Sequence, residues 1–125
     1  MLKKAALLAA ISYSLILAIV SLIKLNNLPD VGISFADKIF HFLAYALLTL
    51  LWFGAFSYSL NLKKKQAVLY AAILAIIFGI IIEVLQDTMT DSRALDMYDV
   101  VANTLGALLA SIVLKVKNKL QVKND

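Results

Sequence analysis

The chain has 125 residues, 62% of them hydrophobic, with a mean hydropathy of +0.89, a formal net charge of +4 and no cysteine. Soluble domains contain about half apolar residues, so this composition indicates a single integral membrane domain. The lack of cysteine excludes a disulfide framework and a thiolate nucleophile. The positive charge does not indicate a nucleic-acid partner, because the lysines flank apolar segments as they do in membrane proteins.

Four apolar segments approach the roughly 20 residues that a helix needs to cross the hydrocarbon core of a bilayer. We therefore predict an all-α fold, a bundle of four transmembrane helices that forms one domain over residues 1–125. The first segment follows two lysines, as in a secretory signal peptide, but it is long and no cleavage site follows it. We expect it to be a retained helix. The predicted helices cover residues 5–23, 39–60, 67–86 and 99–116, and a basic tail covers 117–125.

The lysines indicate how this bundle is oriented. Nine of them precede the first predicted helix, join the second to the third, or lie at or after the end of the fourth, so all nine lie on one side of the membrane. The positive-inside rule makes that side cytoplasmic and places both termini there. The lysines are Lys3, Lys4, Lys63, Lys64, Lys65, Lys115, Lys117, Lys119 and Lys123, and the other side carries Asp30, Asp37, Asp87, Asp91, Asp96 and Asp99.

Polar side chains interrupt the start of the second predicted helix, in the stretch DKIFHFLAY. At helical spacing, Asp37, His41 and Tyr45 form one stripe that descends from the outer side, with Lys38 beside it. His41 is the only histidine, and an imidazole can act as a general base, a metal ligand or a donor to phosphate. An interhelical hydrogen bond is the structural alternative.

The next two predicted helices bring further ionisable groups to the same depth. Glu83 lies about one turn before the end of the third helix, with Gln86 on the same face. In the fourth, Asp96, Asp99 and Asn103 share one face if the stretch SRALDMYDVVAN is helical. Ionisable groups in membrane helices are energetically expensive and usually face the bundle interior at functional sites, so we predict one shared site.

Arg93, the only arginine, precedes the fourth predicted helix. Its planar guanidinium suits a phosphate or carboxylate ligand, or a salt bridge to a neighbouring aspartate. We expect an Arg93 ion-pair network and no resident metal, because a single histidine offers no second imidazole ligand. The alternative is a divalent cation on Glu83, Asp96 and Asp99. The candidate catalytic residues are His41, Glu83 and Asp99, and the candidate binding residues are Asp37, Lys38, Tyr45, Gln86, Arg93, Asp96 and Asn103.

This polar pattern resembles that of the VanZ-like family of small bacterial membrane proteins. The family pattern D-K-x-x-H-x-x-x-Y, E-x-x-Q and R-x-x-D-x-x-D-x-x-x-N-x-x-G is filled at every position, within DKIFHFLAY, GIIIEVLQ and RALDMYDVVANTLGALLA. The sequence departs from the family in the loop before Arg93, which lacks proline and glycine, and at Ala110, where glycine is usual. The resemblance implies a small helical bundle in a bacterial cell membrane and a link to teicoplanin resistance, with no settled biochemical activity.

We therefore predict a site at the outer leaflet for an anionic amphiphile, such as a lipid-linked envelope molecule. Hydrolysis by an activated water is the expected reaction for an enzyme, because Tyr45 is the only hydroxyl or thiol among the candidate residues. One alternative is a non-enzymatic binder of a lipid headgroup, a drug or a partner protein. The other is a polar network that only holds the helices together. Membrane lipids are the expected partners and nucleic acid is not.

The predicted orientation can be tested by labelling single cysteines in this cysteine-free chain. A membrane-impermeant maleimide applied to intact cells should label Ser92→Cys and should not label Gln66→Cys, because only the first position is predicted to face outward. Both variants should react after the membrane is permeabilised. The reverse pattern in intact cells would place the polar residues on the cytoplasmic side.

Overall fold

A computed structural model of the chain describes residues 2–27, 35–89 and 97–124. Its elements, in chain order, are α1 (Leu2–Asn27), α2 (Phe35–Gly54), the short π-helix η1 (Ala55–Ser59), α3 (Lys64–Met89) and α4 (Met97–Asn124). All four α-helices contain a span long and apolar enough to cross a membrane. The predicted all-α fold with four transmembrane helices is therefore confirmed.

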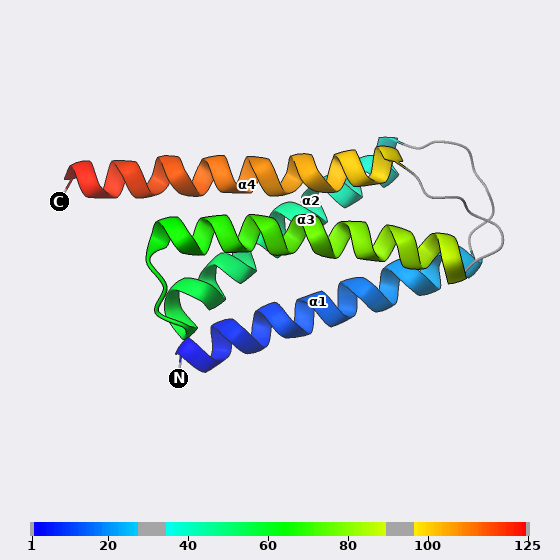
Figure 1. The fold of residues 1–125 in the computed structure, drawn as a ribbon, viewed down its shortest axis with the longest axis horizontal. Coiled ribbons are helices and arrows are strands. Elements are labelled where there is room, and N and C mark those ends of the chain that lie inside the picture. Colours follow the sequence, from blue (N-terminus) through cyan, green and yellow to red (C-terminus); the bar gives the residue numbers. More distant parts are fainter. Residues whose placement is uncertain (1, 28–34, 90–96, 125) are drawn as a thin grey trace.

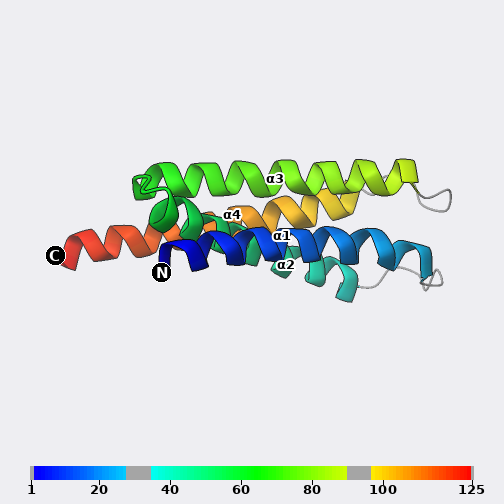
Figure 2. The same cartoon turned by 90° about the horizontal axis from the view of Figure 1, so that it is seen from below.

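The helices lie along one common axis, which Figures 1 and 2 show from two directions. The start of α1 and the end of α4 lie at the same end of the bundle, while α2 and α4 begin, and α3 finishes, at the other end (Figure 1). Helix α2 crosses the bundle obliquely, so that it begins beside α4 and ends near the start of α1. This end-to-end arrangement matches an up-and-down bundle, while the side of the membrane that each end faces stays a prediction.

The ends of α2 and α4 differ from the ends of the helices predicted from the sequence. The segment predicted at 39–60 ends its α-helical part at Gly54 and continues as the π-helix, where Leu60 N donates to Ala55 O at 3.1 Å. Asn61 then adopts a left-handed backbone with φ of 57°, which asparagine tolerates better than most residues and which ends the helix. Helix α4 runs beyond residue 116 to Asn124, because lysine and leucine are good helix formers outside the bilayer as well.

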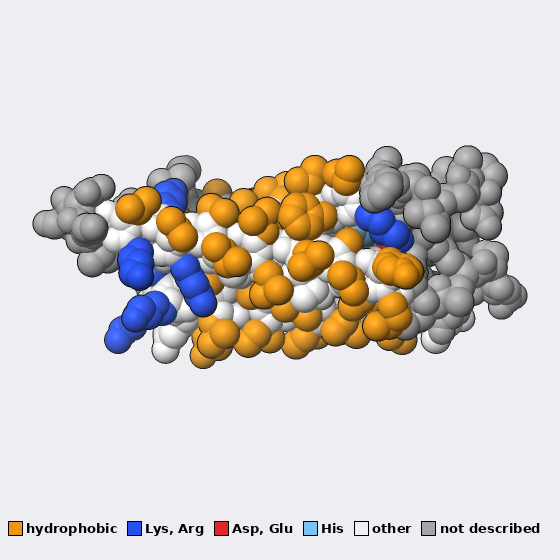
Figure 3. Space-filling model, turned by 90° about the horizontal axis from the view of Figure 1, so that it is seen from above, with side chains coloured by type: hydrophobic (Ala, Val, Ile, Leu, Met, Phe, Trp, Pro, Cys, Tyr) orange, Lys and Arg blue, Asp and Glu red, His pale blue; other side chains and the backbone are white. Residues whose placement is uncertain are grey.

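The surface of the bundle is apolar along most of its length. Leucine and isoleucine side chains such as Leu8, Leu43, Ile77 and Ile112 are exposed, whereas a soluble protein would bury most of them. On the face drawn in Figure 3, a broad hydrophobic belt separates a group of basic side chains at one end from the opposite end. The interior contains a cluster of buried alanine, leucine and tyrosine side chains, which are Leu17, Ala44, Tyr45, Leu48, Ala75 and Ala107.

Helix α1 is joined to the rest of the bundle by polar side chains as well as by packing. The Tyr13 hydroxyl donates to Ala44 O at 2.7 Å, and Trp52 Nε1 donates to Ser14 Oγ at 2.9 Å. Both bonds connect α1 to α2 inside the apolar part of the bundle. Polar side chains of this kind hold membrane helices in a fixed register, since the alternative is an unsatisfied group in hydrocarbon.

Gly106 sets how closely α2 and α4 approach each other. A Cβ atom at this position would lie 2.1 Å from Phe42 O and 3.1 Å from Ala46 N, which are backbone atoms of α2 that cannot rotate away. Small residues allow this kind of direct backbone contact between membrane helices. The contact lies two turns below Asp99 on α4 and next to His41 on α2, so it fixes the distance between those two side chains.

This packing predicts opposite outcomes for two glycine substitutions. Gly106→Ala should lower stability by about 1–3 kcal/mol, because the added methyl group must force the two helices apart. Gly54→Ala is the matched control: its φ of −59° is helical, and an added Cβ would meet nothing within 4 Å. The control should be unchanged, or more stable by up to about 1 kcal/mol. Thermal unfolding in detergent measures both, and equal stability of the two variants would contradict the close contact.

Candidate functional site

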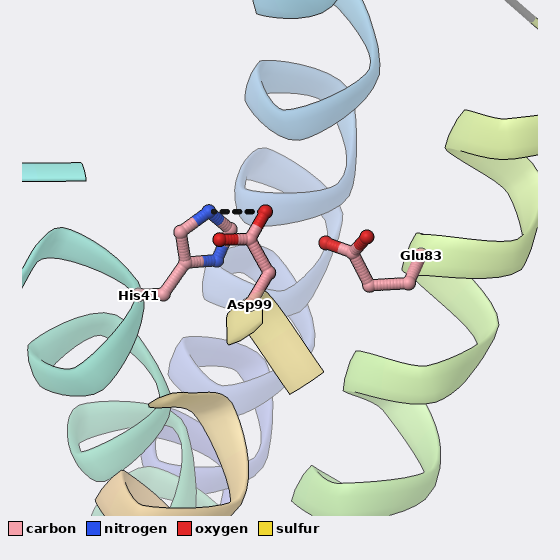
Figure 4. A group of neighbouring side chains, drawn as sticks. All are labelled: His41, Glu83 and Asp99. Atoms are coloured by element: carbon pink, nitrogen blue, oxygen red, sulfur yellow. Dashed lines mark ion pairs between the residues drawn. The ribbon is translucent and has the colours of Figure 1, made fainter. Parts of the chain in front are cut away.

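Three buried ionisable side chains from three different helices meet near one end of the bundle. His41 projects from α2, Glu83 from α3 and Asp99 from the first turn of α4. One ligand atom from each lies within 4.8 Å of the other two. Figure 4 shows the imidazole and the two carboxylates pointing toward one another across the helices. We call these three residues the polar cluster.

A hydrogen bond to Asn103 sets the orientation of the His41 ring. Nδ1 lies 3.1 Å from Asn103 Oδ1, and an amide oxygen can only accept, so Nδ1 carries the proton. In the neutral imidazole Nε2 is then the basic nitrogen. It lies 3.6 Å from Asp99 Oδ2, beyond a normal hydrogen bond and close enough for an ion pair when the ring is protonated. Asn103 therefore aims the basic nitrogen into the cluster.

Lys38 supplies positive charge at the edge of the polar cluster. Its Nζ lies 2.5 Å from Asp99 Oδ1, and its side chain is 23% exposed while that of Asp99 is 1% exposed. The lysine thus reaches from the surface of the bundle to a carboxylate that is otherwise shielded from solvent. A charge-assisted bond of this kind offsets much of the free-energy penalty of burying Asp99.

A second layer of residues lies one helical turn deeper than the polar cluster. Tyr45 follows His41 by four residues, Asn103 follows Asp99 by four, and Gly79 precedes Glu83 by four. A Cβ at Gly79 would lie 3.0 Å from both Asn103 Nδ2 and Tyr45 Cε2, so a larger residue there would press these two side chains out of position by a few tenths of an ångström. The Tyr45 side chain is buried, and its hydroxyl has no hydrogen-bond partner within residues 2–27, 35–89 and 97–124.

The amino-acid sequence of the chain matches a known protein family. The family model described as VanZ/LLP1 matches residues 3–118. The chain belongs to the VanZ/LLP1 family. An uncharacterised protein from Schizosaccharomyces pombe is 31% identical to it over 85 residues, which is 68% of this chain and 50% of that protein. The chain therefore spans about half the length of this fungal relative, and no solved structure matches the chain.

The other motif residues of this VanZ/LLP1 protein fall into two groups. Gln86 Nε2 donates to Ser21 O at 3.0 Å, which connects α3 to α1 and gives this residue a role in helix packing. The side chain of Asp37, and the whole of Arg93 and Asp96, lie outside the described residues, so their predicted roles stay predictions. Of the predicted site residues, His41, Glu83, Asp99, Asn103 and Lys38 lie close together near one end of the bundle, and their roles in a site stay predictions.

Gly79 is the contributor to this region that reasoning from the sequence missed. It sits in an otherwise apolar run of α3, where one glycine is easily taken for ordinary membrane-helix packing. The signal that could have revealed it is its spacing, one turn from Glu83 on the same face.

The single histidine makes the predicted tautomer directly measurable. In metal-free protein at a pH where the imidazole is neutral, ¹⁵N NMR should find the proton of His41 on Nδ1, because Asn103 accepts it. Asn103→Ala should remove this preference, whereas the matched control Thr49→Ala should keep it: Thr49 is also buried, but its hydroxyl bonds to Tyr45 O within α2. A proton on Nε2 in the native protein would contradict the described orientation.

Proposed function

We propose that this protein binds the anionic headgroup of a membrane amphiphile at the polar cluster and hydrolyses it with an activated water. The observation that supports this proposal is the convergence of His41, Glu83 and Asp99 from three helices, beside a partly exposed lysine. All three lie inside segments apolar enough to cross the membrane. A ligand that reaches them is therefore expected to enter from the lipid or from the membrane surface.

The free energy of burial argues for a role beyond packing. A charged side chain at the centre of a membrane helix costs about 2.5–3.5 kcal/mol on insertion scales, and somewhat less near the interface. Helices can be held together by serine, threonine and glycine at lower cost, as Ser14 and Gly106 do here. Two carboxylates and an imidazole in contact are better explained by chemistry that needs them.

Lys38 is the described residue best suited to receive an anionic headgroup. Its ammonium has three donors, and one of them already contacts Asp99. Because the side chain is partly exposed, a phosphate or carboxylate at the surface of the bundle can approach this ammonium. Arg93 would be a second, bidentate contact to the same headgroup, as its fork geometry suits oxyanions.

The cluster also supplies the groups that hydrolysis needs. His41 Nε2 would accept a proton from water as the water oxygen attacks the phosphorus or carbonyl carbon of the headgroup. Asp99 would stabilise the imidazolium that forms, and Lys38 the negative charge on the reacting group. Glu83 would act as the second acid–base group, delivering a proton to the oxygen of the leaving group as its bond breaks. Water is the nucleophile here because no serine or threonine belongs to the cluster.

The family link to glycopeptide resistance suggests where such an activity would operate. A bacterial cell membrane with the cluster at its outer face would give access to lipid-linked envelope molecules, and altering them would change the binding of a lipid-bearing glycopeptide. The alternative is a non-enzymatic binder, in which the same groups hold a headgroup, drug or partner protein without turnover. The Lys38–Asp99 and Gln86–Ser21 contacts also fit a third possibility, a network that only joins helices.

Isosteric variants separate these functions. With anionic phosphate and diphosphate lipids in mixed micelles, His41→Gln and Glu83→Gln should lower phosphate release by about 10²–10⁴-fold, since each removes a proton-transfer group. Lipid binding, followed by native mass spectrometry, should change little in both. Lys38→Met should weaken binding of anionic lipids, and the control Tyr58→Phe, at an exposed position of the π-helix, should change neither quantity.

Other outcomes point elsewhere. Binding without turnover in the native protein would favour the non-enzymatic binder. Equal affinity for anionic and zwitterionic lipids, together with no turnover, would leave only the structural network.

A further inference from the structure

We propose that His41 Nε2, Asp99 Oδ2 and the Glu83 carboxylate together bind one divalent first-row transition metal ion, with zinc as the best fit. This inference rests on the proposed function for the use of the same cluster, and it changes how the water would be activated. With His41 Nε2 and Glu83 holding the ion, the ion would lower the pKa of the water and replace those two residues as proton-transfer groups. It stands on the positions of the ligand atoms, and metal binding can be measured without any substrate. The two proposals can therefore fail separately.

The separations of the ligand atoms suit a common ion. Zinc lies about 2.0–2.2 Å from nitrogen and oxygen ligands, so two ligands of one ion are at most about 4.4 Å apart. His41 Nε2 and Asp99 Oδ2, 3.6 Å apart, already fall within that limit. All three ligand atoms lie within 4.8 Å of one another, so small side-chain rotations of the third residue complete the set.

Both close ligands have the outer partners that metal ligands usually have. A ligating histidine normally donates its second ring N–H to an oxygen acceptor, and ligating carboxylates are hydrogen-bonded in turn. His41 Nδ1 meets Asn103 Oδ1 at 3.1 Å, and Asp99 Oδ1 meets Lys38 Nζ at 2.5 Å. These bonds engage the outward-facing atoms. The other pair of atoms, Nε2 and Oδ2, face each other, and Figure 4 shows the Glu83 carboxylate on the opposite side of Asp99 from His41.

The Tyr45 hydroxyl gives a second and independent indication of a bound ligand. This side chain is 1% exposed, and its hydroxyl has no hydrogen-bond partner among the described residues. Buried hydroxyls are almost always satisfied, and the exceptions often mark a water or an ion. Tyr45 lies one turn below His41 on the same face of α2. A water held in the open position of a three-ligand metal site would satisfy it.

The donor set favours zinc over the hard cations. One imidazole nitrogen and two carboxylate oxygens match zinc sites with three protein ligands and an open position. Calcium takes six to eight oxygen ligands, and magnesium keeps most of its waters. A dication would also balance the two carboxylates that the bundle buries. The sequence favoured an Arg93 network because it lacks a second histidine; the convergence of two carboxylates on the single histidine supplies the missing ligands from other helices.

The test uses the full-length chain in detergent, purified with a tag that contains no histidine because His41 is the sole imidazole. After chelator treatment and incubation with zinc alone, elemental analysis should find one zinc per chain. Chelation should lower the melting temperature and zinc should restore it. Asn103→Ala should weaken zinc binding about 10–100-fold through the lost outer contact, while the exposed control Lys65→Gln should bind as the native protein does.

A spectroscopic readout on the native chain keeps the proposal independent of variants that misfold. Zinc should shift the ¹⁵N resonance of His41 Nε2 far more than that of Nδ1, because only Nε2 is placed to ligate. Zinc content no higher than in His41→Gln, or an unchanged Nε2 resonance, would overturn the metal site. Lipid hydrolysis that survives chelation would also overturn it while supporting the proposed function. Zinc binding without lipid binding would do the reverse.

Discussion

The burial of Asp99 against Lys38 is the interaction on which the polar end of this bundle depends. An uncompensated carboxylate in a membrane helix would be strongly destabilising, and the 2.5 Å contact with Lys38 offsets that penalty at the edge of the bundle. Because Lys38 and His41 lie one turn apart on α2, the same contact that neutralises Asp99 also brings the imidazole to its second oxygen. The neutralisation of Asp99 by Lys38 and the positioning of His41 beside Asp99 therefore depend on the same contact between α2 and α4.

Two glycines make this arrangement geometrically possible. Gly106 lets α4 approach the backbone of α2, and Gly79 leaves room on α3 for Asn103 and Tyr45. A side chain at Gly106 would push α2 and α4, and with them His41 and Asp99, apart. A side chain at Gly79 would crowd the Asn103 amide that bonds to His41 Nδ1. The polar cluster is therefore positioned by close packing of helices rather than by loops. Sites built on such elements hold their side chains more precisely than sites built on loops.

The thickness of the bilayer explains why so much could be predicted from the sequence. Helix length fixes the depth of each residue, so Glu83 at the end of one helix and His41 and Asp99 at the start of two others must share a level. The depth of a residue in the membrane does not determine how its helix is rotated about its own axis, or which side chain of another helix it contacts. The contacts of Lys38 with Asp99 and of Gln86 with Ser21 depend on how the helices are turned, and the sequence pattern does not specify that.

Helix ends were less predictable for a related reason. Hydropathy detects the lipid-facing part of a helix, so it missed the turn of α2 into a π-helix at Ala55 and the continuation of α4 through the basic residues. Both features depend on backbone hydrogen bonding, which cannot be read from the position of apolar residues in the sequence. The role of Gly79 was missed because it comes from a contact between helices and not from α3 itself.

A double-mutant cycle on Lys38 and Asp99 tests the central claim, that the buried charges of the cluster compensate one another. Stability in detergent would be measured for the native protein, Lys38→Met, Asp99→Asn and the double variant. If the charges are coupled, the double variant should be more stable than the sum of the two single effects predicts, by about 1–3 kcal/mol. Additive effects, within about 0.5 kcal/mol, would show that the two residues act independently and would contradict the account.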